Sequence, residues 1–92
     1  MKERGKKIMK KKYYYKGKLV RTSENDYKYA VVANYKDSGE TFLIACCGNY
    51  DLALKRQRSE INYRNDKSII GNKQLNYQKG LCTIDIVELE VR

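Results

Sequence analysis

The sequence predicts a small α+β fold, in which about four antiparallel strands form a sheet and one helix packs on it in the order β-β-β-α-β. Residues 27–35 and 81–91 alternate apolar and polar side chains with the period that is typical of strands. Residues 51–65 follow a helix-capping residue and repeat apolar side chains at helical spacing. The 92 residues suit one domain. We expect a basic flexible arm over residues 1–12 and a single folded domain over residues 13–92.

Three strands are expected before the helix. Residues 13–22 begin with three tyrosines and are interrupted by Gly17, which predicts one strand with a bend or bulge at the glycine. Residues 27–35 place tyrosine, valine and alanine side chains on one face and form the second strand. Residues 36–40 contain a glycine and read as a hairpin loop. Residues 41–47 are apolar on both faces, which predicts a central strand.

The helix is expected to begin after Asn49 or Asp51, since both side chains can accept a hydrogen bond from the first turn. Its weakly apolar stripe consists of Tyr50, Ala53, Leu54, Gln57 and Ile61. Arg56 and Arg64 each lie four residues from Glu60, so part of the helix charge is paired internally.

The last quarter of the chain is less regular. Residues 66–80 contain two apolar residues between turn signals and are expected to be a loop or a short strand. Residues 81–91 form the last strand. Their apolar side chains change parity at Ile86-Val87, which predicts a β-bulge or a strong bend there.

Positive charge is concentrated at the start of the chain. The net charge is +9, and residues 1–20 hold nine cations and one anion, whereas residues 21–92 hold eleven cations and ten anions. Lysine-rich segments of this kind are typical of proteins that bind nucleic acid or acidic partners. The alternative is a solvated tail that aids solubility. Met9 is a second possible initiator, and a chain that starts there would lose four cations and one anion, leaving +6.

Twelve residues are candidates for contact with nucleic acid or a partner. Nine tyrosines stand against one phenylalanine and no tryptophan, and a tyrosine-bearing sheet face could stack unpaired bases. Cross-strand packing and a protein interface are the alternatives for these tyrosines. Basic side chains could contact phosphates or an acidic surface. The candidates are Lys10, Lys11, Lys12, Lys16, Lys18, Lys28, Lys55, Arg58, Arg64, Tyr27, Tyr29 and Tyr35.

Catalysis and metal binding are not expected. The chain has no histidine, so a Ser/His or Cys/His nucleophile cannot form. Its three cysteines, Cys46, Cys47 and Cys82, lack the spacing of a zinc site or a disulfide framework and are expected to be small apolar residues on strands. No cofactor is predicted. The absence of a long apolar run argues against a membrane span, and the cysteine usage favours a reducing cytoplasm.

The style of the sequence resembles the short accessory proteins of phages and plasmids, which include anti-CRISPR inhibitors of host defence. The segments that carry the resemblance lie within residues 13–65: YYYKGKLVRTS at 13–23, YKYAVV at 27–32 and ACCG at 45–48, before a charged helix. The resemblance implies a phage-type protein acting in the bacterial cytoplasm. Many anti-CRISPR proteins are acidic DNA mimics, whereas this basic chain would engage guide RNA, target DNA or an acidic protein groove.

The predicted function is therefore that of a small non-enzymatic binding protein, which engages a nucleic acid or a nucleoprotein complex as an anti-CRISPR-like inhibitor of host defence. The alternative is a protein-protein interaction module, or a homodimer formed through an exposed strand edge, with no role in nucleic-acid binding.

Overall fold

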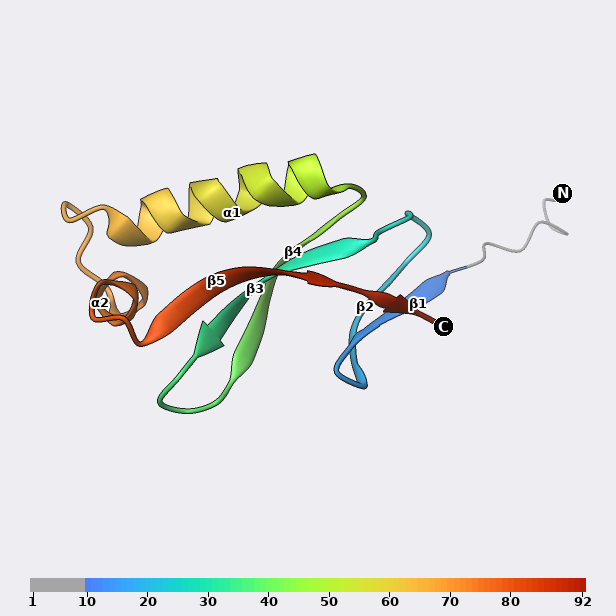
Figure 1. The fold of residues 1–92 in the computed structure, drawn as a ribbon, viewed down its shortest axis with the longest axis horizontal. Helices are drawn as coiled ribbons and strands as arrows, with labels where there is room; N and C mark the ends of the chain where they lie inside the picture. Colours follow the sequence, from blue (N-terminus) through green and yellow to red (C-terminus); the bar gives the residue numbers. More distant parts are fainter. Residues whose placement is uncertain (1–9) are drawn as a thin grey trace, which may run out of the picture.

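The computed structural model describes residues 10–92. They form two antiparallel sheets of three strands each, with strand orders β2-β1-β6 and β4-β3-β5, and two helices (Figure 1). We call them the N-terminal sheet and the central sheet. The elements are β1 (Lys11–Tyr15), β2 (Lys18–Ser23), β3 (Tyr29–Tyr35), β4 (Thr41–Cys47), α1 (Tyr50–Asn65), α2 (Asn72–Gln78), β5 (Cys82–Glu88) and β6 (Glu90–Val91). The α+β class is confirmed, but the predicted single sheet of about four strands with one helix is not.

The hydrophobic core lies between the central sheet and α1. β3 is the middle strand, paired with β4 on one side and β5 on the other. Its residues Val31 and Ala33 are fully buried and belong to one cluster with Ala53 of α1 and Cys82 and Ile84 of β5. The alternation in residues 27–35 thus correctly predicted a strand, which begins at Tyr29.

The segment expected to be one bent strand is a hairpin. Lys16 and Gly17 both have positive φ angles, 53° and 76°, and form the two-residue turn between β1 and β2. A two-residue turn with two positive φ angles matches the twist of the flanking strands, so the chain reverses where a bend was predicted. The bulge lies at Val20, where the register shifts between Tyr13 and Tyr14. β1 starts at Lys11, two residues earlier than the predicted domain boundary, and the rest of the predicted arm, residues 1–9, is outside the described residues.

The hairpin of β3 and β4 has the predicted bounds at residues 41–47, but β4 is an edge strand and not a central one. Its register with β3 shifts between Val31 and Val32, which leaves Ile44 as the extra residue of a bulge. The apolar residues on its second face are not covered by another strand. Phe42 and Leu43 remain 52% and 37% exposed.

The predicted helix is confirmed as α1. The side chain of Asn49 accepts a hydrogen bond from the Leu52 N–H at 2.9 Å and caps its first turn. Both predicted ion pairs form, Arg56–Glu60 at 3.7 Å and Arg64–Glu60 at 2.8 Å. Within residues 10–92, no helix is long and apolar enough to cross a membrane.

Residues 66–80 contain a helix, α2, where a loop or short strand was expected. This seven-residue helix has no side-chain cap and few apolar residues, so neither capping nor periodicity indicates it locally. Tertiary contacts hold it. Tyr77 packs against the core, and the Gln78 side chain donates a hydrogen bond to the Arg64 carbonyl at 3.2 Å.

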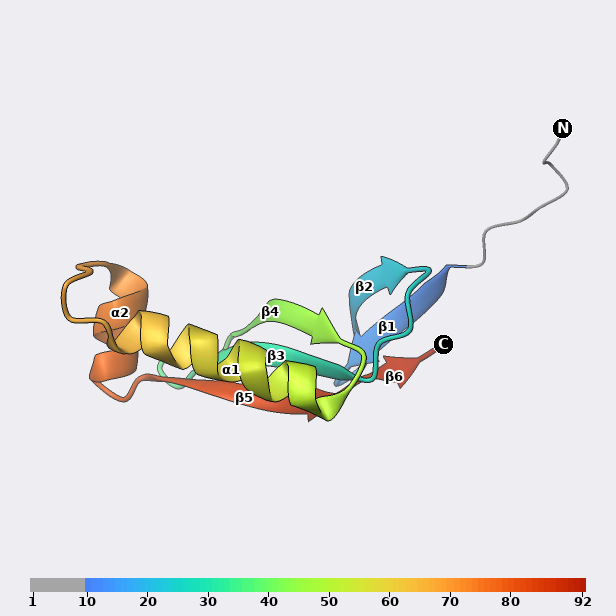
Figure 2. The same cartoon turned by 90° about the horizontal axis from the view of Figure 1, so that it is seen from above.

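The C-terminal strand connects the two sheets. β5 pairs with β3 without a register shift as far as Glu88, so the bulge or bend predicted at Ile86-Val87 is absent. The break falls at Leu89, where the strand leaves β3, and β6 then pairs with β1. Seen from above, α1 lies along the central sheet, and the N-terminal sheet lies beyond one end of that sheet (Figure 2).

Candidate binding surfaces

The predicted basic residues of the first third of the chain lie on and beside the N-terminal sheet. Residues 10–28 hold seven cations and two anions. One of these cations, Lys11, is neutralised by Asp26, and this hydrogen bond lowers the pKa of Asp26. We define the basic end as the exposed lysines that form no ion pair with the described residues: Lys10, Lys12, Lys16, Lys18 and Lys28.

Two arginines stack on tyrosines next to the basic end. The guanidinium of Arg92 lies 4.3 Å from the ring centroid of Tyr14, and that of Arg21 lies 5.6 Å from the ring centroid of Tyr27. Such contacts hold the planar cation at a fixed place while its edge stays available for hydrogen bonds. The sequence pattern did not indicate them, because Arg92 meets Tyr14 only through the pairing of β6 with β1.

The three candidate tyrosines do not form the open stacking platform that the sequence suggested. Tyr29 and Tyr35 face α1 and pack against the core. Tyr29 meets Tyr50 edge to face, and Tyr35 meets Phe42 in the same way, each pair with centroids 5.5 Å apart. The helix covers this face of the central sheet, so these rings take the cross-strand and core-packing role that was their alternative. Tyr27 precedes β3 and contacts Tyr13 edge to face at 5.4 Å.

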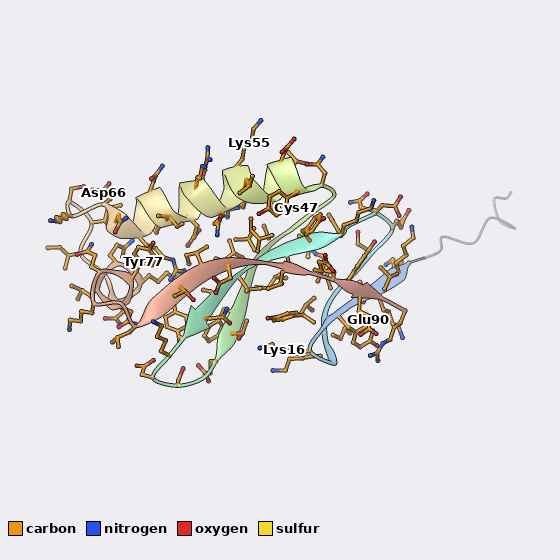
Figure 3. The ribbon with its side chains drawn as sticks, viewed as in Figure 1. Lys16, Cys47, Lys55, Asp66, Tyr77 and Glu90 are labelled. Carbon is orange, nitrogen blue, oxygen red and sulfur yellow. The ribbon has the colours of Figure 1, made fainter. Side chains whose placement is uncertain are left out.

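The candidate residues of α1 fall into two groups. Lys55 and Arg58 are exposed. Figure 3 shows Lys55 pointing away from the central sheet, while Lys16 lies at the hairpin turn beyond the opposite face. The helix lysine and arginine therefore do not join the basic end in one surface.

Arg64 is not a surface contact. Its side chain is only 3% exposed, donates from Nε to Glu60 at 2.8 Å and donates from Nη1 to the Tyr35 hydroxyl at 3.0 Å. Arg64 lies three residues after Ile61, so the helical period carries it onto the buried stripe despite its charge.

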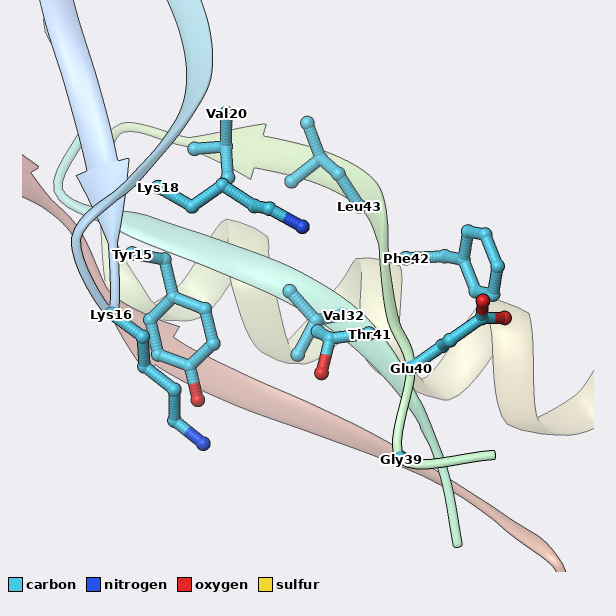
Figure 4. Close-up of a pocket in the computed structure, with 10 residues that line it drawn as sticks. All are labelled: Tyr15, Lys16, Lys18, Val20, Val32, Gly39, Glu40, Thr41, Phe42 and Leu43. Carbon is cyan, nitrogen blue, oxygen red and sulfur yellow. The ribbon is translucent and has the colours of Figure 1, made fainter. Parts of the chain in front are cut away.

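A cleft of about 410 Å³ separates the hairpin from the central sheet. The hairpin contributes Tyr15, Lys16, Lys18 and Val20, and the sheet contributes Val32 and Leu43 from the face opposite α1 (Figure 4). The walls are apolar and two lysines stand at the rim. Its volume falls in the range of small-molecule sites.

A second hollow lies on the other side of β4. It has a volume of about 500 Å³ and is bounded by the strand, by α1 and by the start of α2. Three cations line it, Arg56, Arg64 and Lys73, against the single carboxylate of Glu60. Phe42 and Leu43 border both the cleft and this groove, so β4 forms the wall between the two.

The three cysteines lie on strands as expected and are free thiols, with Cys47 and Cys82 buried and Cys46 half-buried. Burial raises the pKa of each above the ordinary 9.0, and the charge of Arg21 partly offsets this for Cys46. In residues 10–92, His, Cys, Asp and Glu side chains form no group of three that could hold a metal ion.

We expect the thiols to react with a disulfide reagent much more slowly in the native protein at pH 8 than in urea, with Cys46 reacting first, because the reagent attacks exposed thiolates. Because the native pKa values are raised, stability should fall as the pH rises above about 9, where unfolded thiols ionise. Stopped-flow absorbance measures the rates. Equal rates in the native and unfolded protein would contradict the burial of these groups.

Comparison of the chain with protein-family models, with curated proteins and with solved structures gave no significant match.

Proposed function

We propose that this protein is a small non-enzymatic binding protein that engages a nucleic acid, alone or within a nucleoprotein complex, through its basic end. The observation that carries the proposal is the distribution of charge over the fold. Residues 10–28 hold seven cations and two anions, while residues 29–92 hold nine cations and eight anions. The excess is thus confined to the N-terminal sheet and the link that follows it.

The geometry of the basic end supports contact with phosphates. Its five lysines are exposed and lack ion pairs with the described residues, so binding a phosphate would not require an internal pair to break. Arg21 and Arg92 flank them with guanidinium groups already placed on tyrosine rings. Since Tyr29 and Tyr35 are committed to the core, sequence-specific base stacking has no support from them, and recognition would rest on charge and backbone shape.

The resemblance to anti-CRISPR proteins extends the proposal to a biological role. A basic binding protein of this size would inhibit a nucleic-acid-guided defence complex by engaging its guide RNA or its target DNA in the bacterial cytoplasm.

Binding to a short mixed-sequence DNA duplex tests the proposal. Contact with about five phosphates predicts a slope of about −4.5 in a plot of log affinity against log salt concentration. The double variant Lys12→Ala/Lys18→Ala should reduce the magnitude of this slope by about two. Fluorescence anisotropy over a salt series measures it, with a single-stranded RNA of the same length in parallel.

The matched control removes two charges elsewhere. Lys67 and Lys79 are exposed and lie at either end of the segment that contains α2, away from the N-terminal sheet. Lys67→Ala/Lys79→Ala should leave the slope unchanged. Equal effects of the two double variants would mean that net charge alone drives binding, and no binding to duplex or RNA would reject the proposal.

A further inference from the structure

The outer edge of β4 is the most unusual surface away from the basic end. In the central sheet, β4 is a terminal strand, so no strand of the described residues pairs with its outer side. Unpaired edges are normally short, charged or covered, because they can pair with other chains. Here Phe42 and Leu43, at 52% and 37% exposure, lie on the open edge.

The hydrogen-bond pattern shows which backbone groups are free to bind a new strand. The Tyr35 N–H donates to the Glu40 carbonyl at 2.9 Å, so this pair and, two residues further, Ala33 and Phe42 exchange the hydrogen bonds of the β3–β4 ladder. Because alternate residues of a strand point their backbone groups to opposite sides, Thr41 and Leu43 direct their N–H and C=O groups outward. The bulge at Ile44 ends this regular stretch, so an added strand would be short.

The two hollows on either side of β4 would receive the side chains of an added strand. Successive side chains of a strand point to opposite faces of its sheet. One set would therefore enter the groove next to α1, which has Arg56, Arg64 and Lys73 against Glu60. The other set would enter the cleft beneath the hairpin, with its apolar walls and the rim lysines Lys16 and Lys18.

Arg64 gives the groove a built cationic group. Its Nε and Nη1 are engaged by Glu60, Tyr35 and the Cys82 sulfur, whereas Nη2 makes no hydrogen bond with the described residues and is not among their fully enclosed unpaired atoms. The guanidinium is thus fixed from behind and keeps one nitrogen for a carboxylate in the groove.

We propose that the outer edge of β4 binds an extended acidic segment of a partner protein as an additional strand. Acidic side chains of the segment enter the groove of Arg56, Arg64 and Lys73, and the apolar side chains between them enter the cleft beneath the hairpin. Main-chain hydrogen bonds to Thr41 and Leu43 align the segment. A second copy of this chain is a poorer occupant, because it would bring the same cationic rim against itself. This surface is separate from the basic end and does not depend on nucleic-acid binding.

The experiment measures the affinity of a fluorescein-labelled peptide of alternating glutamate and valine by anisotropy. A peptide of alternating lysine and valine, and one with glutamates and valines in two blocks, are the ligand controls. We expect saturable binding of the first peptide only, with backbone amide shifts at Thr41 and Leu43 in the NMR spectrum.

One pair of variants isolates the backbone contact. Thr41 is the first residue of β4 and its N–H points outward, so Thr41→Pro removes a donor for the partner without removing a donor from the ladder. Thr41→Val loses the same side-chain hydrogen bond to Asn34, which is 2.6 Å long, but keeps the N–H. Thr41→Pro should weaken peptide binding about tenfold relative to Thr41→Val. The amide spectrum of each variant reports whether the sheet remains folded.

A second pair isolates the charge. Lys73→Glu should weaken binding about tenfold, whereas Arg58→Glu, the same type of charge reversal on the outer face of α1, should have little effect. Equal affinities of Thr41→Pro and Thr41→Val would overturn the proposal. A dimer that Thr41→Pro dissociates in sedimentation would instead identify a second copy as the occupant, and competition by single-stranded RNA at this edge would identify a nucleic acid.

Discussion

Replacing Arg64 with alanine is expected to lower the free energy of unfolding by about 3 kcal/mol, the cost typical of removing one partner from a buried ion pair. Arg64 and Glu60 are only 3% and 12% exposed at their side chains. The change leaves the Glu60 carboxylate with Arg56 alone, at 3.7 Å, and removes the donor that holds the Tyr35 hydroxyl. Urea unfolding followed by circular dichroism measures the loss.

Arg58→Ala is the matched control, since it removes an exposed arginine from the same helix. Its effect should stay within about 0.5 kcal/mol, as for most surface substitutions. Arg64→Lys keeps the charge but not the forked donors that reach Glu60 and Tyr35 together, so its stability should fall between the wild type and Arg64→Ala. If Arg58→Ala and Arg64→Ala unfold at the same urea concentration, the network does not stabilise the fold.

The Arg64 network also shows where sequence patterns identify a position but not its environment. Arg64 continues the stripe of Gln57 and Ile61, so its place facing the sheet follows from the helical period. Its charge pointed to the surface instead. Burial became acceptable only because Glu60 lies one turn earlier and Tyr35 lies across from it on β3, and the second of these partners comes from tertiary structure.

The elements predicted best are those that local patterns specify fully. The alternation in β3, the loop with Gly39, and the Asn49 cap of α1 each lie within a few residues of the structure they produce. The missed features depend on distant partners. The break at Leu89 reflects a change of pairing from β3 to β1, and the exposure of β4 reflects the absence of a further strand beside it, neither of which a local pattern encodes.

The same distinction applies to the candidate surfaces. The lysines of the basic end were predicted one by one, because a cluster of cations early in the chain needs no tertiary information to be noticed. The groove beside β4 was not, since it combines Arg56 of α1 with Lys73 of α2, in a segment expected to lack a helix.

Tyr13 is expected to be the second large determinant of stability, because it anchors the N-terminal sheet to the central sheet. It is fully buried, its hydroxyl donates to the Asn25 carbonyl, and the same oxygen accepts the Tyr27 N–H at 3.0 Å. These contacts fix the link between β2 and β3. Tyr13→Phe leaves the Asn25 carbonyl and the Tyr27 N–H without this partner and should cost about 1–2 kcal/mol. Tyr13→Ala also removes the ring and should cost about 3–5 kcal/mol.

Tyr14→Phe separates the loss of these hydrogen bonds from the general effect of removing a tyrosine hydroxyl. Tyr14 is the next residue of β1, and its hydroxyl makes no hydrogen bond with the described residues, so its stability should match the wild type. Limited proteolysis adds a local readout: Tyr13→Phe should be cut faster between Ser23 and Lys28, because the anchored link opens more often. If Tyr13→Phe and Tyr14→Phe are equally stable and equally resistant in this segment, the Tyr13 hydroxyl does not hold the two sheets together.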